Sequence, residues 1–117
     1  MTTSFEDRQN EVDTAHKMAR DLHECLAADD ELFDAAKAAK EIAGDLDSAE
    51  CCEVVRDFDI CINSAHAGAM ALKVTLKAAK VKAKADDLPE TVEVIEEAMA
   101  EIKVLLSELD ELLPEDA

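Results

Sequence analysis

The sequence predicts an all-α antiparallel bundle of four to five helices, and three observations lead to this fold class. Along most of the chain, apolar or small residues recur at alternating spacings of four and three, which places them in one line on a helix, here called a seam. The chain has only two glycines and two prolines, so it offers few turns. It has three phenylalanines and no tyrosine or tryptophan, so the core must be aliphatic and rich in alanine. At 117 residues, we expect a single domain.

The first two helices are expected at about residues 5–28 and 30–43. The first seam is interrupted by one polar residue, Arg8, and consists of Phe5, Val12, Ala15, Ala19, Leu22 and Leu26. Asp29 and Asp30 can cap the start of the second helix, and Gly44 indicates its end. The apolar positions of the second helix are Leu32, Phe33, Ala35, Ala36, Ala39, Ile42 and Ala43.

The middle of the chain carries the longest seam, formed by Cys51, Val55, Phe58, Ile62, Ala65, Ala69, Leu72, Leu76, Ala79 and Ala83. Asp47 and Glu50 have the spacing of a capping box that opens a helix. A continuous helix from there to the next proline would exceed its neighbours in length. Asn63 and Ser64 can end one helix and begin another, and Gly68 weakens the helix nearby. We therefore expect two segments, at about residues 48–62 and 65–85.

The last helix is expected at about residues 88–113. Asp87 can cap it, Pro89 suits its first turn, and Pro114 ends it. Its predicted seam is Leu88, Val92, Ile95, Met99, Ile102, Leu106, Leu109 and Leu113. Five lysines precede the turn and five glutamates follow it, so an antiparallel hairpin would set opposite charges side by side. These residues are Lys73, Lys77, Lys80, Lys82, Lys84, Glu90, Glu93, Glu96, Glu97 and Glu101.

The net charge of −17 argues against binding to nucleic acid or to anionic membranes and favours a basic protein partner. The first thirty residues carry several charges and contain no apolar signal-peptide core, and the longest charge-free run, residues 60–72, is too short to span a bilayer. The four cysteines form no CxxC pattern, which favours reduced thiols. We therefore expect a cytoplasmic protein.

The leading functional hypothesis is a non-enzymatic acidic bundle that binds a basic protein, as an inhibitor or nucleic-acid mimic directed at a nucleic-acid-binding machine. The sequence offers no nucleophile with a base, no glycine-rich phosphate loop and no basic aromatic patch, so we expect neither catalysis nor a metal or cofactor. A homodimer is left open, because a regular seam can be buried by helices of the same chain or by helices of a second chain. The candidate partner-binding residues are Asp29, Asp30, Glu31, Asp45, Asp47, Glu93, Glu97 and Glu101.

His66 supports an alternative hypothesis. It lies among small residues in the charge-free run, where a docking protein could reach its ring. In size, acidity and the local setting of Ala65 and His66, the chain resembles histidine-containing phosphotransfer domains. The resemblance implies that His66 is the phosphoacceptor. The usual signature places lysine and glycine at the third and fourth positions after the histidine, where this chain has Ala69 and Met70. The simpler interpretation is a histidine packed at a helix junction and hydrogen-bonded to Asn63 or Ser64.

A second alternative is a metal-binding or redox-active bundle. His16 and His23 lie seven residues apart on one edge of the first helix. Carboxylate-bridged metal centres in helical bundles carry a Glu-x-x-His motif. None of the three histidines of this chain has a glutamate three residues before it. Cys51 and Cys52 are expected in the first turn of a helix, where the helix dipole lowers a thiol pKa. Because Cys51 is part of the seam, burial as a small apolar residue is the stronger interpretation for it.

Overall fold

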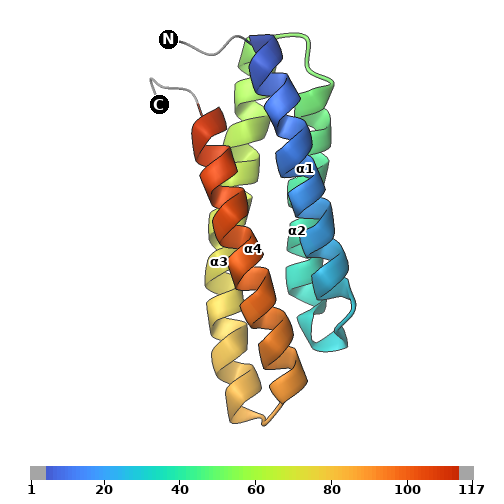
Figure 1. The fold of residues 1–117 in the computed structure, drawn as a ribbon, viewed down its shortest axis with the longest axis vertical. Coiled ribbons are helices and arrows are strands. Elements are labelled where there is room, and N and C mark those ends of the chain that lie inside the picture. Colours follow the sequence, from blue (N-terminus) through green and yellow to red (C-terminus); the bar gives the residue numbers. More distant parts are fainter. Residues whose placement is uncertain (1–4, 114–117) are drawn as a thin grey trace.

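The computed structural model of the chain describes residues 5–113 and shows four α-helices packed side by side (Figure 1). They are α1 (Phe5–Ala27), α2 (Phe33–Glu50), α3 (Val55–Ala85) and α4 (Pro89–Leu112), with a short 3₁₀ helix, η1 (Asp30–Leu32), before α2. Successive helices are antiparallel. Both α1 and α3 pack against α2 and α4, so α1 and α3 lie diagonally across the bundle. The predicted all-α antiparallel bundle is confirmed.

Each helix contributes a line of fully buried aliphatic side chains to one continuous core. The predicted seam of α1 is confirmed from Val12 to Leu26, and that of α3 is confirmed from Phe58 to Leu76. The core is rich in alanine, as expected, which allows the helix axes to approach closely. The largest buried side chains are Leu22, Leu26, Ile42, Leu46, Phe58, Ile62, Leu72, Leu76, Ile95, Ile102, Leu105 and Leu109.

The predicted helix boundaries between residues 43 and 65 are wrong. Helix α2 continues through Gly44 to Glu50, so Asp47 and Glu50 form its last turn and not a capping box. Helix α3 begins at Val55 and continues unbroken through Asn63 and Ser64. The chain accommodates this long helix because the α3–α4 hairpin extends past the α1–α2 connection at one end of the bundle (Figure 1).

Three hydrogen bonds explain these corrected boundaries. The Gln9 side-chain amide donates to the carbonyl oxygens of Ala49, at 3.3 Å, and Cys52, at 2.5 Å, and so satisfies carbonyl groups where α2 ends. The Ser64 hydroxyl donates to the Asp45 carboxylate of α2 at 2.9 Å and does not cap a new helix. The turn between α2 and α3 leaves Cys51 and Val55 exposed, so neither belongs to the core as predicted.

Two apolar assignments also differ from the prediction. Phe33, expected to face the core, has 71% of its surface exposed. In α4 the buried line of residues is rotated relative to the predicted seam. The apolar surface of α4 is broad enough to hold two neighbouring seams, and the packing of α1 and α3 determines which of them is buried. Ile95, Ile102 and Leu109 are fully buried as predicted, and Leu106, also predicted, is buried with 8% of its surface exposed. The observed seam of α4 is Thr91, Ile95, Ala98, Ile102, Leu105, Leu109 and Leu112.

The connection between α3 and α4 is built differently from the predicted cap. Asp87 has a φ of 57° and ends α3, with the amide of Leu88 bonded to the carbonyl oxygen of Ala83 at 2.9 Å. This is the arrangement in which a left-handed residue closes a helix, a role usually taken by glycine. Helix α4 begins at Pro89 as predicted and ends at Leu112. Pro114, expected to end it, lies outside the described residues.

Polar contacts between helices lie at both ends of the bundle. The Arg8 guanidinium of α1 contacts the Asp59 carboxylate at 2.5 Å and the Leu112 carbonyl oxygen at 2.7 Å, and it lies 4.9 Å from the centroid of the Phe58 ring. Arg8 thereby joins α1, α3 and α4. At the other end, Asp29 accepts from the Glu31 amide at 2.9 Å and so caps η1, whereas α2 itself begins without a side-chain cap. Between these ends, Lys80 pairs with Glu96 at 3.3 Å, in line with the predicted charge pairing across the hairpin.

Candidate functional site

An apolar groove with an acidic rim lies between α1 and α4. It has a volume of about 310 Å³ and is lined by Met18, Asp21, Ala100, Glu101 and Val104. Val104 is half exposed, at 51%. Glu97 lies one helical turn before Glu101 and adds a second carboxylate of α4 to the rim. We call these six residues the acidic groove.

Glu101 is the most unusual side chain of the acidic groove. Its Oε2 atom is buried and has no hydrogen-bond partner among the described residues. Burial raises the pKa of the Glu101 carboxyl, and the charges of Glu97 and Asp21 raise it further. The pKa of the neighbouring Cys25 thiol is also raised, by burial and then by Glu101 and Glu97. The groove therefore concentrates negative charge at a place where the chain leaves one carboxylate oxygen unsatisfied.

The structure brings together only some of the acidic residues predicted to bind a partner. Glu93, Glu97 and Glu101 follow one another at intervals of four and so lie along one side of α4. Asp29 has a structural role, because it also accepts from the Thr91 hydroxyl at 2.8 Å. Asp45 accepts from Ser64 on a different side of the bundle. The exposed Asp30 and Glu31 lie in the α1–α2 connection, and Asp47 lies near the opposite end of α2.

Sequence reasoning missed Asp21, Met18 and Val104. Each lies beside a seam, which the heptad pattern indicates, but the pattern alone does not say which residues of α1 and α4 lie at the same level. That register is fixed in the folded chain by contacts such as the one from Arg8 to the Leu112 carbonyl. A search for acidic residues beside the seams of two antiparallel helices could have paired Asp21 with Glu101.

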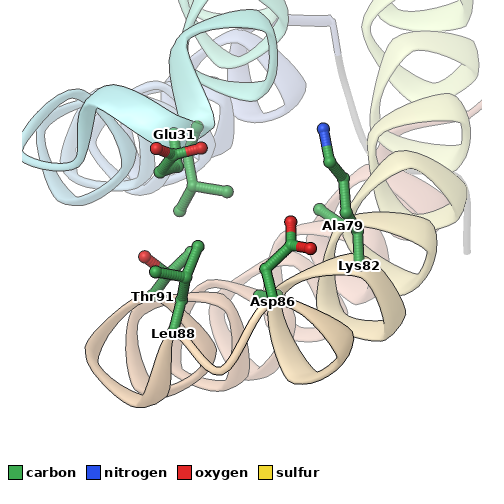
Figure 2. A pocket seen from close by; sticks show the side chains of 8 residues that line it. Glu31, Ala79, Lys82, Asp86, Leu88 and Thr91 are labelled. Atoms are coloured by element: carbon green, nitrogen blue, oxygen red, sulfur yellow. The ribbon is translucent and has the colours of Figure 1, made fainter.

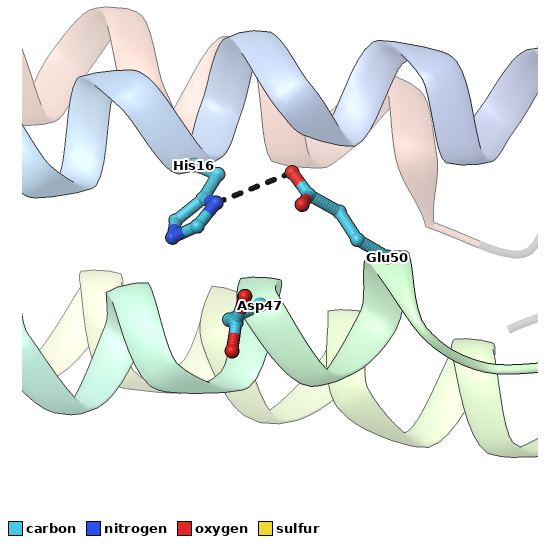
Figure 3. A group of neighbouring side chains, drawn as sticks. All are labelled: His16, Asp47 and Glu50. Atoms are coloured by element: carbon cyan, nitrogen blue, oxygen red, sulfur yellow. Dashed lines mark hydrogen bonds and ion pairs between the residues drawn. The ribbon is translucent and has the colours of Figure 1, made fainter.

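A second cluster lies between α1 and the last turn of α2 (Figure 3). His16 Nδ1 is 3.2 Å from Glu50 Oε1, and Asp47 approaches from one helical turn before Glu50. One ligand atom from each of the three residues lies within 4.8 Å of the others. Imidazole nitrogen and carboxylate oxygen are ligands of Zn²⁺. His23, grouped with His16 in the sequence-based hypothesis, instead lines a separate groove with Phe33, Lys37 and Lys40.

The cysteines are arranged differently from the prediction. Cys51 and Cys52 follow the end of α2, whereas the prediction placed them in the first turn of a helix. The Cys52 thiol donates to the Ser48 carbonyl oxygen at 3.2 Å. Burial, the neighbouring Cys52 thiol and the charges of Asp45 and Asp57 raise the pKa of Cys61 to about 11. Cys61 is therefore protonated at neutral pH.

His66 contacts α4 and not its neighbours on α3. Its Nε2 atom lies 2.8 Å from Asp110 Oδ1. The predicted bond to Asn63 or Ser64 is replaced by this contact. A phosphoryl group on Nε2 would displace Asp110 and lie beside its negative charge. Phosphotransfer through His66 stays a prediction, which labelling with acetyl phosphate and its loss in a His66→Gln variant would test.

A small pocket lies where η1 meets the α3–α4 hairpin (Figure 2). Its charged lining residues are Glu31, Lys82 and Asp86, and Thr91 and Leu88 come from the start of α4 and the turn before it. Its volume of about 40 Å³ suits water rather than a larger ligand. The pocket is therefore too small to hold a substrate.

Across residues 5–113, no helix combines the length and the apolar character needed to cross a membrane. Comparisons with protein-family models, with curated proteins and with solved structures found no significant match to this chain.

Proposed function

We propose that this chain is a non-enzymatic binding protein that captures a basic segment of another protein in the acidic groove. The observation that carries the proposal is Glu101, whose buried Oε2 atom has no partner among the described residues and whose pKa is raised by burial and by the charges of Glu97 and Asp21. A cation from a partner would supply the missing hydrogen bond and offset the repulsion among these carboxylates.

The shape of the groove indicates the chemistry of the partner. Met18, Ala100 and Val104 provide an apolar floor, and the carboxylates lie beside it. Glu97 and Glu101 are one helical turn apart, a rise of about 6 Å. A helical segment with arginines four residues apart and a leucine or methionine between them matches this pattern. Arginine suits the site better than lysine because its planar guanidinium pairs with a carboxylate through two hydrogen bonds.

Inhibition of a nucleic-acid-binding protein is a specific form of this function. Basic segments that contact phosphates do so through the same arginines and lysines that the acidic groove would engage. The line of Glu93, Glu97 and Glu101 presents several negative charges on a rigid helix, and such arrays speed the association of oppositely charged proteins. Binding of this chain and of nucleic acid to one basic segment would then be mutually exclusive.

A peptide-binding experiment tests the proposal. The probe is a synthetic helical peptide with arginines at positions i and i+4 beside a leucine, titrated into the protein by calorimetry at several salt concentrations. The Glu97→Gln/Glu101→Gln variant should bind at least about tenfold more weakly than the unmodified chain, since it loses two desolvated ion pairs. Raising the salt concentration should weaken binding to the unmodified chain.

The matched control is Asp34→Asn/Glu41→Gln, which removes two exposed carboxylates from α2 and the same amount of charge. It should change the affinity by less than about twofold, because these carboxylates lie outside the groove. Equal losses in both variants would show non-specific attraction and reject the groove. Failure of the unmodified chain to bind the peptide, or binding that ignores salt, would also count against the proposal. Displacement of the same peptide from a DNA duplex would test the inhibitor form.

A second candidate function is the binding of a divalent metal ion, which the grouping of His16, Asp47 and Glu50 favours. Three ligands from two helices leave a coordination position for water, as in open Zn²⁺ sites. Titration with Zn²⁺ should raise the melting temperature. The increase should disappear in His16→Ala and persist in His23→Ala, since His23 lies in a different groove. Absence of any thermal shift with Zn²⁺ would reject this candidate.

A further inference from the structure

Helix α3 has a second apolar line on the side that faces away from the core. The residues of this line, here called the outer seam, are Ile60, Ala67, Met70, Ala71, Val74, Ala78, Val81 and Ala85. All are exposed, and among the larger side chains the exposed fractions include 57% for Ile60, 67% for Val74 and 71% for Val81. Helix α3 is therefore apolar on two opposite sides, although only one of them is covered by α2 and α4.

The outer seam has the spacing of a helix-packing surface. From Ala67 to Ala85 its members recur at alternating intervals of four and three, with Met70 beside the line. The alanines alternate with larger valines, which lets a second helix approach closely and interdigitate. From Ile60 to Ala85 the seam runs about 38 Å along the helix. Such a length is ample for a helix-to-helix interface.

The charges of α3 indicate what covers this surface. Helix α3 has six basic and two acidic residues, a net charge of +4, whereas α4 has eight acidic and one basic, a net charge of −7. Five of the six basic residues of α3 lie in its second half, between Lys73 and Lys84. The first half of α3 is bordered instead by carboxylates of its neighbours, Asp45 beside Ser64 and Asp110 beside His66. Carboxylates thus border the first half of this surface and lysines its second half, with Arg56 the one basic residue of the first half.

We propose that a second copy of this chain packs against the outer seam, with its α3 antiparallel to the first. Turning one α3 end for end about the middle of the seam, near Lys73, sets Lys82 at the level of the partner's Asp45. The same operation sets Lys77 within about one helical turn of the level of the partner's Asp110. Because the arrangement is two-fold symmetric, each contact occurs twice. A parallel pair would bring the lysine-rich halves together, and their repulsion opposes it.

This interface is independent of the acidic groove. The groove is formed by α1 and α4, and the outer seam lies on the side of α3 away from the core, diagonally across the bundle from α1. Dimerisation would leave both grooves of the pair open to their partners. Failure of peptide binding and failure of dimerisation are therefore distinguishable, because different residues and different measurements report on them.

Sedimentation equilibrium of the full chain tests the proposal. The unmodified chain should form dimers in the micromolar range, and Val74→Glu/Val81→Glu should weaken the dimer at least about a hundredfold by placing charges in its centre. The matched control is Val54→Glu/Val55→Glu, two exposed valines outside the seam, which should dimerise like the unmodified chain. Circular dichroism checks that each variant is folded. A chain that stays monomeric at millimolar concentration, or a dimer that survives the seam variant, overturns the proposal.

Charge exchange tests the antiparallel register. Lys82→Asp and Asp45→Lys should each weaken the dimer, because each places two pairs of like charges at one level. The double variant should recover most of the lost affinity, since the pairs are restored with their signs exchanged. Recovery to within about threefold of the unmodified chain supports the register. A double variant as weak as the product of the two single effects would reject this antiparallel arrangement.

Discussion

At the scale of single residues, Glu101 ties stability to pH. Its pKa is raised in the folded chain above the ordinary value of 4.5, so the folded chain holds this proton more tightly than the unfolded chain does. The stabilising contribution of the protonated carboxyl is fully present below pH 4.5 and is lost as the pH rises through the folded pKa. At pH 7 the charged Glu101 therefore opposes folding.

Glu101→Gln should be more stable than the unmodified chain at pH 7, by at most about 1 kcal/mol once solvent screening of this partly buried group is considered. The difference should shrink toward zero as the pH falls to 4.5, where the unmodified carboxyl becomes protonated. Urea unfolding of both proteins between pH 4 and pH 7 measures it. The same substitution should weaken binding of the basic peptide, so stability and binding change in opposite directions. A variant less stable than the unmodified chain at pH 7 would contradict the assigned repulsion.

At the scale of helices, the two glycines provide a matched comparison. Both lie inside helices, at Gly44 of α2 and Gly68 of α3. A Cβ atom at Gly44 would meet no atom within 4 Å, whereas one at Gly68 would lie 3.1 Å from Cγ1 of Ile42. Gly44→Ala should therefore stabilise the chain by about 0.5–1 kcal/mol through helix propensity alone. Gly68→Ala should gain less, because Ile42 must move.

Urea midpoints of the two alanine variants measure this difference, with circular dichroism confirming equal helix content. A loss of stability in Gly44→Ala would indicate that α2 is interrupted there, as Gly44 suggested when considered in the sequence alone. Equal gains in both variants would show that the α2–α3 contact at Gly68 is looser than the distance to Ile42 implies.

The helices themselves could be predicted from the sequence, but several of their ends could not. Repeats of four and three identified the seams of α1 and of most of α3, where the larger apolar residues follow the buried line. In α4 two apolar lines run side by side, and only the neighbouring helices determine which one is buried. Asp47 with Glu50, and Asn63 with Ser64, have the local pattern of caps. Glu50 and Ser64 instead contact other helices, so tertiary contacts decide their role.

At the scale of the whole molecule, charge divides the bundle into unlike surfaces. The excess of acid over base was visible in the sequence, and so were the glutamates of α4. The acidic groove was not, because it depends on the level at which α1 lies against α4. Likewise, the grouping of His16 with Asp47 and Glu50 could not be predicted, because it depends on α2 extending to Glu50, beyond its predicted end. Composition therefore supports the prediction of a basic partner, and the register between helices determines where the acidic groove lies.

The same charge excess predicts how the chain responds to salt. A net charge of −17 on 117 residues gives strong self-repulsion, and only three lysine or arginine ion pairs join the described residues to offset it. Salt screens repulsion between exposed carboxylates, so stability should rise between 10 and 500 mM NaCl. A gain of about 1 kcal/mol would raise the melting temperature by about 4 °C in a domain of this size.

Scans must be run at one protein concentration, because dimerisation also stabilises the fold. The Glu97→Gln/Glu101→Gln variant should gain less from salt, since it has lost part of the repulsion. A melting temperature that falls with NaCl would mean that attractive ion pairs outweigh the repulsion. Such a result would contradict the repulsion assigned to the carboxylates of the acidic groove.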